Sequence, residues 1–215
     1  MPDFATLITD ARKFHSTLAK NNNREWWGAH KDTYDTQLKA PALSLIERLT
    51  PEIADLSGLP VTGKLFRAHR DVRFSKDKTP FNTHLHMIWM AKTEGLQDVA
   101  FFFGIGQDYV SAGGGIMSFE KPTLENWRLF VDQDQKRILK IVERLKADQF
   151  TLREPALKRV PSGYDKDHPA GDLLRMKGCV ASRELGQTAT VETDVLAAFA
   201  ALWPLNNLLI QIVEA

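Results

Sequence analysis

The chain has 215 residues, of which 43% are hydrophobic and 26% are charged, as in an ordinary globular domain with room for one sizeable core. A formal net charge of +1 excludes the molecule-wide positive field of proteins that coat nucleic acids, so any basic patch must be local. Cys179 is the only cysteine, which excludes intramolecular disulfides and zinc-ribbon spacings and fits a reducing, cytoplasmic setting.

The start of the chain is predicted to be helical. Apolar residues recur there at helical spacing, with Asp3 as the expected N-cap, and the stretch lacks the continuous apolar core of a signal peptide. Asn22, followed three residues later by Glu25, resembles a capping box and predicts the start of a second helix. Pro41 is expected to kink or split that second helix.

The middle of the chain is predicted to form strands. Residues 65–74 show no helical stripe and are expected to begin a strand, residues 75–80 a loop, and residues 83–91 another strand. Residues 99–106 and 109–117 read as a hairpin across Gln107-Asp108. The run from Phe101 to Phe103 is typical of a strand covered on both faces, and the glycines at 113–115 suggest bends or close backbone approach.

The last third of the chain returns to helices. Pro122 is expected to open one helix, a second follows residue 134, and a short helix at 171–176 leads into a strand at 178–182. The C-terminal helix is expected to bend at Pro204, and its apolar run is broken by Pro204, Asn206 and Asn207, so no membrane span is expected. The predicted fold is a single α+β domain, residues 1–215, with a largely antiparallel sheet of about four to six strands packed against N- and C-terminal helices.

The basic segment, residues 64–78, is the densest charge cluster in the chain. It contains six cationic residues and only two carboxylates, Asp71 and Asp77. If residues 65–74 form a strand, Arg67 and Arg73 share one face and Arg70 lies on the other. Guanidinium and ammonium groups suit phosphate and carboxylate. The cationic residues are Lys64, Arg67, Arg70, Arg73, Lys76 and Lys78.

Three functional hypotheses follow from this segment. The leading one is a small anionic ligand, bearing phosphate or carboxylate, bound by five of these cations and by the backbone N–H groups around Gly114. The alternative is a protein-interaction or structural module in which the segment is an internal ion-pair network. The third, nucleic-acid binding, is disfavoured by the near-neutral net charge. The residues name no cofactor, reaction or oligomeric state, and they do not decide between a binding protein and an enzyme. The five cations of the leading hypothesis are Arg67, Arg70, Arg73, Lys76 and Lys78.

Three histidines are weaker candidates for chemistry. His84 and His86 would share one face of a strand, as two metal ligands do, with Asp167, His168 or Asp172 as a third ligand. Half-buried histidines that bond to backbone or carboxylate explain the same pattern. His168 is the best-placed general acid or base because its unperturbed pKa lies near neutrality. A histidine before proline also commonly fixes a loop by hydrogen bonding.

Several motifs resemble a widespread bacterial and fungal family of uncharacterised proteins, catalogued as domain of unknown function twenty-four sixty-one. The resemblance spans nearly the whole chain and implies a single-domain protein with no established activity. The family more often has tyrosine at the position of His69 and a small residue at that of His86, so it assigns neither histidine a role. The matching motifs are Asn21-Asn22-Asn23-Arg24-Glu25-Trp26, Arg70-Asp71-Val72-Arg73-Phe74-Ser75-Lys76-Asp77-Lys78-Thr79-Pro80, Gly113-Gly114-Gly115, Lys158-Arg159-Val160-Pro161, Asp167-His168-Pro169-Ala170 and Ser182-Arg183-Glu184-Leu185.

Overall fold

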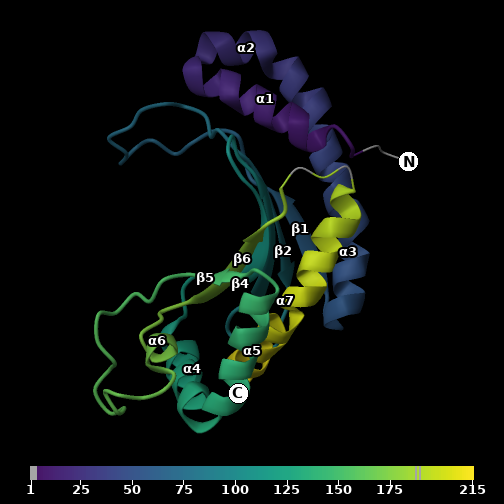
Figure 1. Ribbon diagram of the computed structural model, residues 1–215. Coiled ribbons are helices and arrows are strands. Elements are labelled where there is room, and N and C mark those ends of the chain that lie inside the picture. Colours follow the sequence, from purple (N-terminus) through teal and green to yellow (C-terminus); the bar gives the residue numbers. More distant parts are fainter. Residues whose placement is uncertain (1–3, 187, 189) are drawn as a thin grey trace.

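The protein is built on a six-stranded antiparallel sheet with the strand order β1-β2-β3-β4-β6-β5 (Figure 1). The computed structural model describes residues 4–186, 188 and 190–215. With helices at the N- and C-terminal ends of the chain, this arrangement confirms the predicted α+β class. The strands are β1 (Val61–Leu65), β2 (Leu85–Ala91), β3 (Val99–Ile105), β4 (Val110–Ile116), β5 (Thr151–Leu152) and β6 (Cys179–Glu184).

Two long helices, α3 (Ala40–Ser57) and α7 (Val191–Val213), cover one face of this sheet (Figure 1). Alternation along β2 and β3 turns the large side chains of Trp89, Phe101 and Phe103 toward them, and all three are fully buried. Phe102 points to the opposite face and is only half-buried, so the prediction that the aromatic run is covered on both faces holds for one face only. The sheet therefore presents one core face and one more open face.

The chain begins with a helix, makes a single turn, and then continues as an unbroken helical stretch. We call these first helices together the helical arm. Asn23, rather than the predicted Asn22, caps the second helix by accepting a hydrogen bond from the N–H of Trp26 at 2.9 Å. Asn22 instead bonds both backbone groups of Phe81 through its side-chain amide, so a long-range contact displaced the expected local cap. The predicted N-cap Asp3 lies outside the described residues. The arm comprises α1 (Leu7–Lys20), α2 (Arg24–Thr33), the π-helix η1 (Tyr34–Lys39) and α3.

Pro41 does not split this arm. It stands at the second position of α3, and because η1 runs directly into α3, the hydrogen bond that its missing N–H would make falls at the irregular turn of the π-helix. The helix therefore continues from residue 24 to residue 57 with its hydrogen-bond spacing widened once.

The strand predicted at residues 65–74 was wrong. β1 ends at Leu65, and it occupies residues 61–65, which were predicted to be part of a loop. Gly63 explains the shift, because a Cβ there would lie 2.3 Å from Cγ2 of Ile46, so only glycine lets α3 pack this closely on the edge strand. After Leu65 the chain leaves the sheet, and Arg67, Arg70 and Arg73 do not lie on the faces of a strand.

The predicted hairpin between β3 and β4 is confirmed, and the N–H of Gly106 donates to the carbonyl of Tyr109 at 2.9 Å across its turn. Pro122 opens a helix as predicted, and the short helix and following strand near residues 171–184 are also confirmed. Strand β5 was not predicted, because two residues carry no periodicity. The C-terminal helices are α4 (Lys121–Gln133), α5 (Gln135–Ala147), α6 (Gly171–Leu174) and α7.

Helix α7 is long and apolar enough to cross a bilayer by length and composition, contrary to the expectation from its sequence. It runs on through Pro204 without ending, and its side chains pack on β3 and β4 in the core. Asn206, fully buried, donates to the carbonyl of Ala100 at 3.1 Å and so ties the helix to β3. Burial in the protein core accounts for the apolar composition of α7.

Candidate functional site

The basic segment lies at one end of the sheet, in the loop that joins β1 to β2. In Figure 1 this loop projects away from the sheet on the side opposite α3 and α7. Its base is closed by backbone hydrogen bonds from Arg70 to Pro80 at 2.9 Å and from Asn82 to Ala68 at 2.7 Å. The loop is therefore a structured excursion with a defined base.

The distal half of the basic segment, residues 70–78, is largely bonded to itself. Arg70 donates to Asp77 Oδ2 at 2.5 Å and to the carbonyl of Thr79 at 3.1 Å. Arg73 donates two hydrogen bonds to Asp71, from Nε to Oδ1 at 3.0 Å and from Nη2 to Oδ2 at 2.7 Å. These arginines are therefore already matched within the loop.

The remaining distal cations differ from each other. Lys78 Nζ donates to the carbonyl of Val72 at 3.0 Å, so it too serves the loop. Lys76 is exposed, and in the part of the chain that the structure describes its side chain has no hydrogen-bond or ion-pair partner.

The two carboxylates of the loop are held in their charged form. The backbone N–H of Thr79, followed by the Arg70 guanidinium and the Thr79 hydroxyl, lowers the pKa of Asp77 to about 2. The Arg73 side chain and backbone N–H lower the pKa of Asp71 below its ordinary value. Both carboxylates therefore stay ionised at neutral pH and neutralise the arginines beside them.

The proximal half of the segment is arranged differently. Lys64 at the end of β1 and Arg67 just beyond it are exposed, and among the described residues neither side chain has a hydrogen-bond or ion-pair partner. Both border a cavity of about 530 Å³ between β1 and the helical arm, which we call the edge pocket. The edge pocket is lined by Trp27, Lys31, Tyr34, Asp35, Lys39, Leu43, Gly63, Lys64, Leu65, Phe66, Arg67, Ala68 and His69.

The helical wall of the edge pocket adds further positive charge. Lys31, Asp35 and Lys39 are spaced four residues apart along α2 and η1; Lys31 bonds to Asp35, and Lys39 Nζ lies 3.8 Å from the same carboxylate. The hydrogen bond from Lys31 is the main cause that lowers the pKa of Asp35. The lining thus holds four cations, counting Lys64 and Arg67, against one carboxylate that two lysines share.

The π-helix forms part of the same wall. Short π-helical turns are uncommon and occur frequently at functional sites. Here η1 supplies Tyr34, Asp35 and Lys39 to the pocket, and burial, with a smaller contribution from Asp35, raises the pKa of Tyr34 to about 12. Trp27 and Phe66 complete an aromatic lining beside the cations. Trp27 and Tyr34 are buried and pack on other rings, so Phe66, which is 43% exposed, is the ring that leaves a face open to the pocket.

His84 and His86 stack with their ring centroids 3.7 Å apart, and His86 Nε2 lies 2.5 Å from the hydroxyl of Tyr109. Burial, with smaller contributions from the neighbouring histidines, lowers the pKa of His86 to about 3. Across residues 4–186, 188 and 190–215, no three metal-binding side chains are grouped so that they could hold an ion. The third ligands considered from the sequence belong to the loop around α6, away from this pair.

Sequence reasoning missed a further buried histidine, His15 on α1. It is 1% exposed, and neither ring nitrogen has a hydrogen-bond partner among the described residues. Burial, and then the neighbouring His84, lowers its pKa to about 4. His15 is therefore a neutral imidazole inside the core, and its helical spacing with Ala11 and Leu18 was the available signal for burial.

The structure does not bring Gly114 to the basic segment. Gly114 is in β4, which β2 and β3 separate from β1, and a Cβ on it would lie 2.2 Å from the carbonyl oxygen of Ala100 and 2.9 Å from Leu202 of α7. This glycine permits α7 to pack on the sheet. Its backbone lies on the covered side, away from the edge pocket.

His168 also has a structural role, because its side chain holds the loop before α6 in place. Its Nδ1 accepts the N–H of Ala170 at 3.0 Å, and its Nε2 lies 3.4 Å from Asp132 Oδ1. The side chain is 7% exposed. Both nitrogens are thus engaged in holding the loop, which favours the loop-fixing interpretation over proton transfer.

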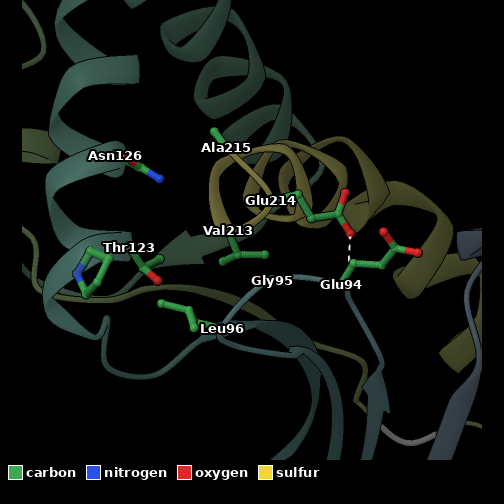
Figure 2. A pocket seen from close by; sticks show the side chains of 9 residues that line it. Glu94, Gly95, Leu96, Thr123, Asn126, Val213, Glu214 and Ala215 are labelled. Atoms are coloured by element: carbon green, nitrogen blue, oxygen red, sulfur yellow. Dashed lines mark hydrogen bonds between the residues drawn. The ribbon is translucent and has the colours of Figure 1, made fainter.

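One further hollow carries the opposite charge. Figure 2 shows it between the loop after β2, the start of α4 and the end of α7, with Glu94 and Glu214 on one side and Leu96 and Val213 nearby. The N–H of Glu94 donates to Glu214 Oε1 at 3.3 Å. Within the described part of the chain, the lining of this hollow contains no lysine, arginine or histidine, so it does not compete with the edge pocket for an anion.

Comparison with known proteins agrees with the resemblance seen in the motifs. A search of curated proteins finds no match. A family model described as "Conserved hypothetical protein (DUF2461)" matches residues 10–210, which is most of the chain and includes both walls of the edge pocket. The chain therefore belongs to this family of conserved hypothetical proteins.

Proposed function

We propose that the protein binds a small anionic ligand, carrying a phosphate or carboxylate on a flat ring, in the edge pocket. The observation that carries this proposal is the pair Lys64 and Arg67, which border the cavity and whose side chains have no hydrogen-bond or close ion-pair partner among the described residues; Arg67 acts on Asp71 only through a weaker electrostatic interaction. This assignment moves the binding role from Arg70, Arg73 and Lys78, which are bonded within the loop, to the proximal half of the segment.

The electrostatics favour an anion at this place. Four cations around one cavity repel one another, and Asp35 compensates only part of that charge. A bound phosphate or carboxylate would relieve the repulsion and accept the forked N–H groups of Arg67. The ring of the ligand would lie against Phe66, which is 43% exposed and would gain contact area at little cost in side-chain entropy.

The internal ion-pair network, the alternative reading of the basic segment, describes its distal half. There it supports the proposal rather than opposing it, because a self-bonded loop holds the neighbouring cations in place before a ligand arrives. Nucleic-acid binding gains little support, because the unpaired cations surround a cavity and the net charge of the chain is +1.

The test is titration with phenyl phosphate, inorganic phosphate and phenol, followed by calorimetry and by thermal unfolding. Phenyl phosphate should bind and raise the melting temperature, because a ligand that binds only the folded state stabilises it. Arg67→Ala should weaken its affinity by about tenfold or more, as expected for the loss of a charged hydrogen bond of roughly 1.5–3 kcal/mol.

Arg73→Ala is the matched control, since it removes the same residue type from the same segment at a position outside the pocket. It should bind phenyl phosphate with unchanged affinity. The proposal fails if phenyl phosphate does not bind, or if Arg73→Ala and Arg67→Ala weaken it equally.

A further inference from the structure

A second cationic hollow lies at the other edge of the sheet, and the proposed function does not involve it. It has a volume of about 700 Å³ and lies between α5 and residues 158–175, the loop and short helix that precede β6. We call it the loop pocket. The lining includes five lysine and arginine residues and a single carboxylate, Asp172.

Only part of this positive charge is neutralised. Arg175 bonds to Asp172 and donates to the carbonyl of Lys158 at 3.3 Å, so both members of that pair are engaged. Lys166 lies 3.6 Å from its neighbour Asp167, with both side chains strongly exposed.

Three cations of the loop pocket remain: Lys146 at the end of α5, and Lys158 and Arg159 across the cavity. In the described part of the chain, none of their side chains has a hydrogen-bond or ion-pair partner. They come from the two walls of the cavity, α5 and the loop, and the carboxylate of the described lining, Asp172, is already bonded to Arg175.

The floor of the loop pocket distinguishes it from the edge pocket. It consists of aliphatic side chains, Leu139 and Val142 of α5, Val160 of the loop and Leu173 of α6. Val142 and Leu173 belong to the main core and are 8% and 4% exposed. Among the residues that the structure describes, no phenylalanine, tyrosine or tryptophan lines this cavity, and the imidazole of His168 is only 7% exposed.

The walls of the loop pocket are fixed by hydrogen bonds that do not use the free cations. His168 holds the turn at Ala170, and Arg175 holds the carbonyl of Lys158. A Cβ on Gly171 would lie 3.2 Å from Val160, which shows how closely the loop and the short helix pack. A cavity whose shape is set in this way loses little entropy when a ligand enters.

We propose that the loop pocket is a second, separate binding site, which takes an anionic headgroup, phosphate or carboxylate, on a short aliphatic chain. Lys158, Arg159 and Lys146 bind the headgroup, and the chain lies on the aliphatic floor. Charge selects the headgroup, and the absence of aromatic side chains selects an alkyl over an aryl body. This proposal is independent of the edge pocket.

The test uses hexyl phosphate, hexanoate and hexanol, with the methyl groups of leucine and valine observed by NMR. Hexyl phosphate should shift the methyl signals of Val142, Val160 and Leu173 in a saturable way, and comparison with hexanoate identifies the preferred headgroup. The double variant Lys158→Ala/Arg159→Ala should weaken hexyl phosphate by about tenfold or more, as expected for removing charged donors.

Two variants serve as controls. Lys136→Ala/Lys140→Ala removes two exposed lysines of α5 that do not line the cavity, and Arg67→Ala removes the edge-pocket cation. Both should leave the affinity within about twofold, because neither touches the ligand. The proposal is overturned if hexyl phosphate does not shift these methyl signals, or if hexanol binds as tightly as both anions. It is also overturned if the control pair weakens binding as much as the double variant. Binding lost only in Arg67→Ala would overturn it while leaving the edge pocket intact.

Discussion

The two halves of the basic segment contain the same residue types and differ in what surrounds them. The distal half carries Asp71 and Asp77 close in sequence and is bonded to itself, whereas Lys64 and Arg67 stand beside a cavity without partners. Placing cations close together costs electrostatic free energy. Carboxylates of the same loop offset this cost in the distal half, whereas no hydrogen-bonded carboxylate offsets it in the proximal half. A count of cations therefore locates a charged segment, and the positions of its carboxylates and carbonyls decide which cations are available to a ligand.

The comparison of the two halves assumes that the buried histidines at this end of the sheet are neutral at pH 7 and add no positive charge. We expect the largest effect from His15, whose pKa is lowered to about 4 by burial and by His84. Because the unfolded chain takes up a proton near pH 6.5 and the folded one does not, stability should fall as pH drops from about 6.5 toward 4. Between pH 7 and pH 4.5, the free energy of unfolding of His15→Phe should fall by on the order of 2–3 kcal/mol less than that of the wild-type protein. Urea unfolding at the two pH values measures this difference.

Above pH 7 the stabilities of wild-type protein and His15→Phe should change in parallel, since neither state binds a proton at this position. An equal loss of stability in both proteins between pH 7 and pH 4.5 would show that His15 is not buried as a neutral imidazole.

The next largest effect is expected from Arg70→Ala. The Arg70 side chain is 26% exposed and bonds Asp77 and Thr79, so its removal should lower the free energy of unfolding by about 1–2 kcal/mol. The pKa of Asp77 should also rise from about 2, though only in part, because the N–H of Thr79 is the largest cause of its depression. Urea unfolding and carboxyl NMR titration measure these two changes.

Arg67→Ala is the comparison for that experiment. It removes a guanidinium without a hydrogen bond, so the unfolding midpoint should stay nearly unchanged while the affinity for phenyl phosphate falls by about tenfold or more. If Arg67→Ala destabilised the protein as much as Arg70→Ala, the division of the segment into a bonded half and a free half would be wrong.

The smallest effect is expected from Arg73→Ala. This pair with Asp71 is well formed, but the Arg73 side chain is 77% exposed, and exposed ion pairs contribute little because water and salt screen them. The unfolding midpoint should not change measurably, and the pKa of Asp71 should rise toward its ordinary value. A clear loss of stability would mean that the whole distal loop depends on this pair.

Most elements of the fold could be predicted, and the errors share a cause. The β3–β4 hairpin and the helix that Pro122 opens follow from turn residues and from local periodicity. The strand predicted at residues 65–74 failed because β1 pairs four residues earlier, where Gly63 admits α3. The cap predicted at Asn22 failed because that side chain bonds Phe81, 59 residues away.

The candidate site could be predicted only in part. The charge density of residues 64–78 was visible, and so was the spacing of Lys31, Asp35 and Lys39, which was the available signal for a charged helical wall. The aromatic lining from Trp27 and the π-helix itself were not anticipated, because a widened helical turn has no distinctive sequence pattern.

The amino-acid sequence by itself determined the α+β class, the hairpin, most helices and the existence of a concentrated basic segment. These features depend on residues close together in the chain, whose spacing and backbone preferences act locally. Only the tertiary structure decided that Arg70 and Arg73 bond to carboxylates of the loop while Lys64 and Arg67 have no hydrogen-bond partner among the described residues. It also decided that α2 and η1 form the opposite wall of the edge pocket. Charge pairing and cavity shape depend on which distant segments meet, and that is settled by packing over the whole core.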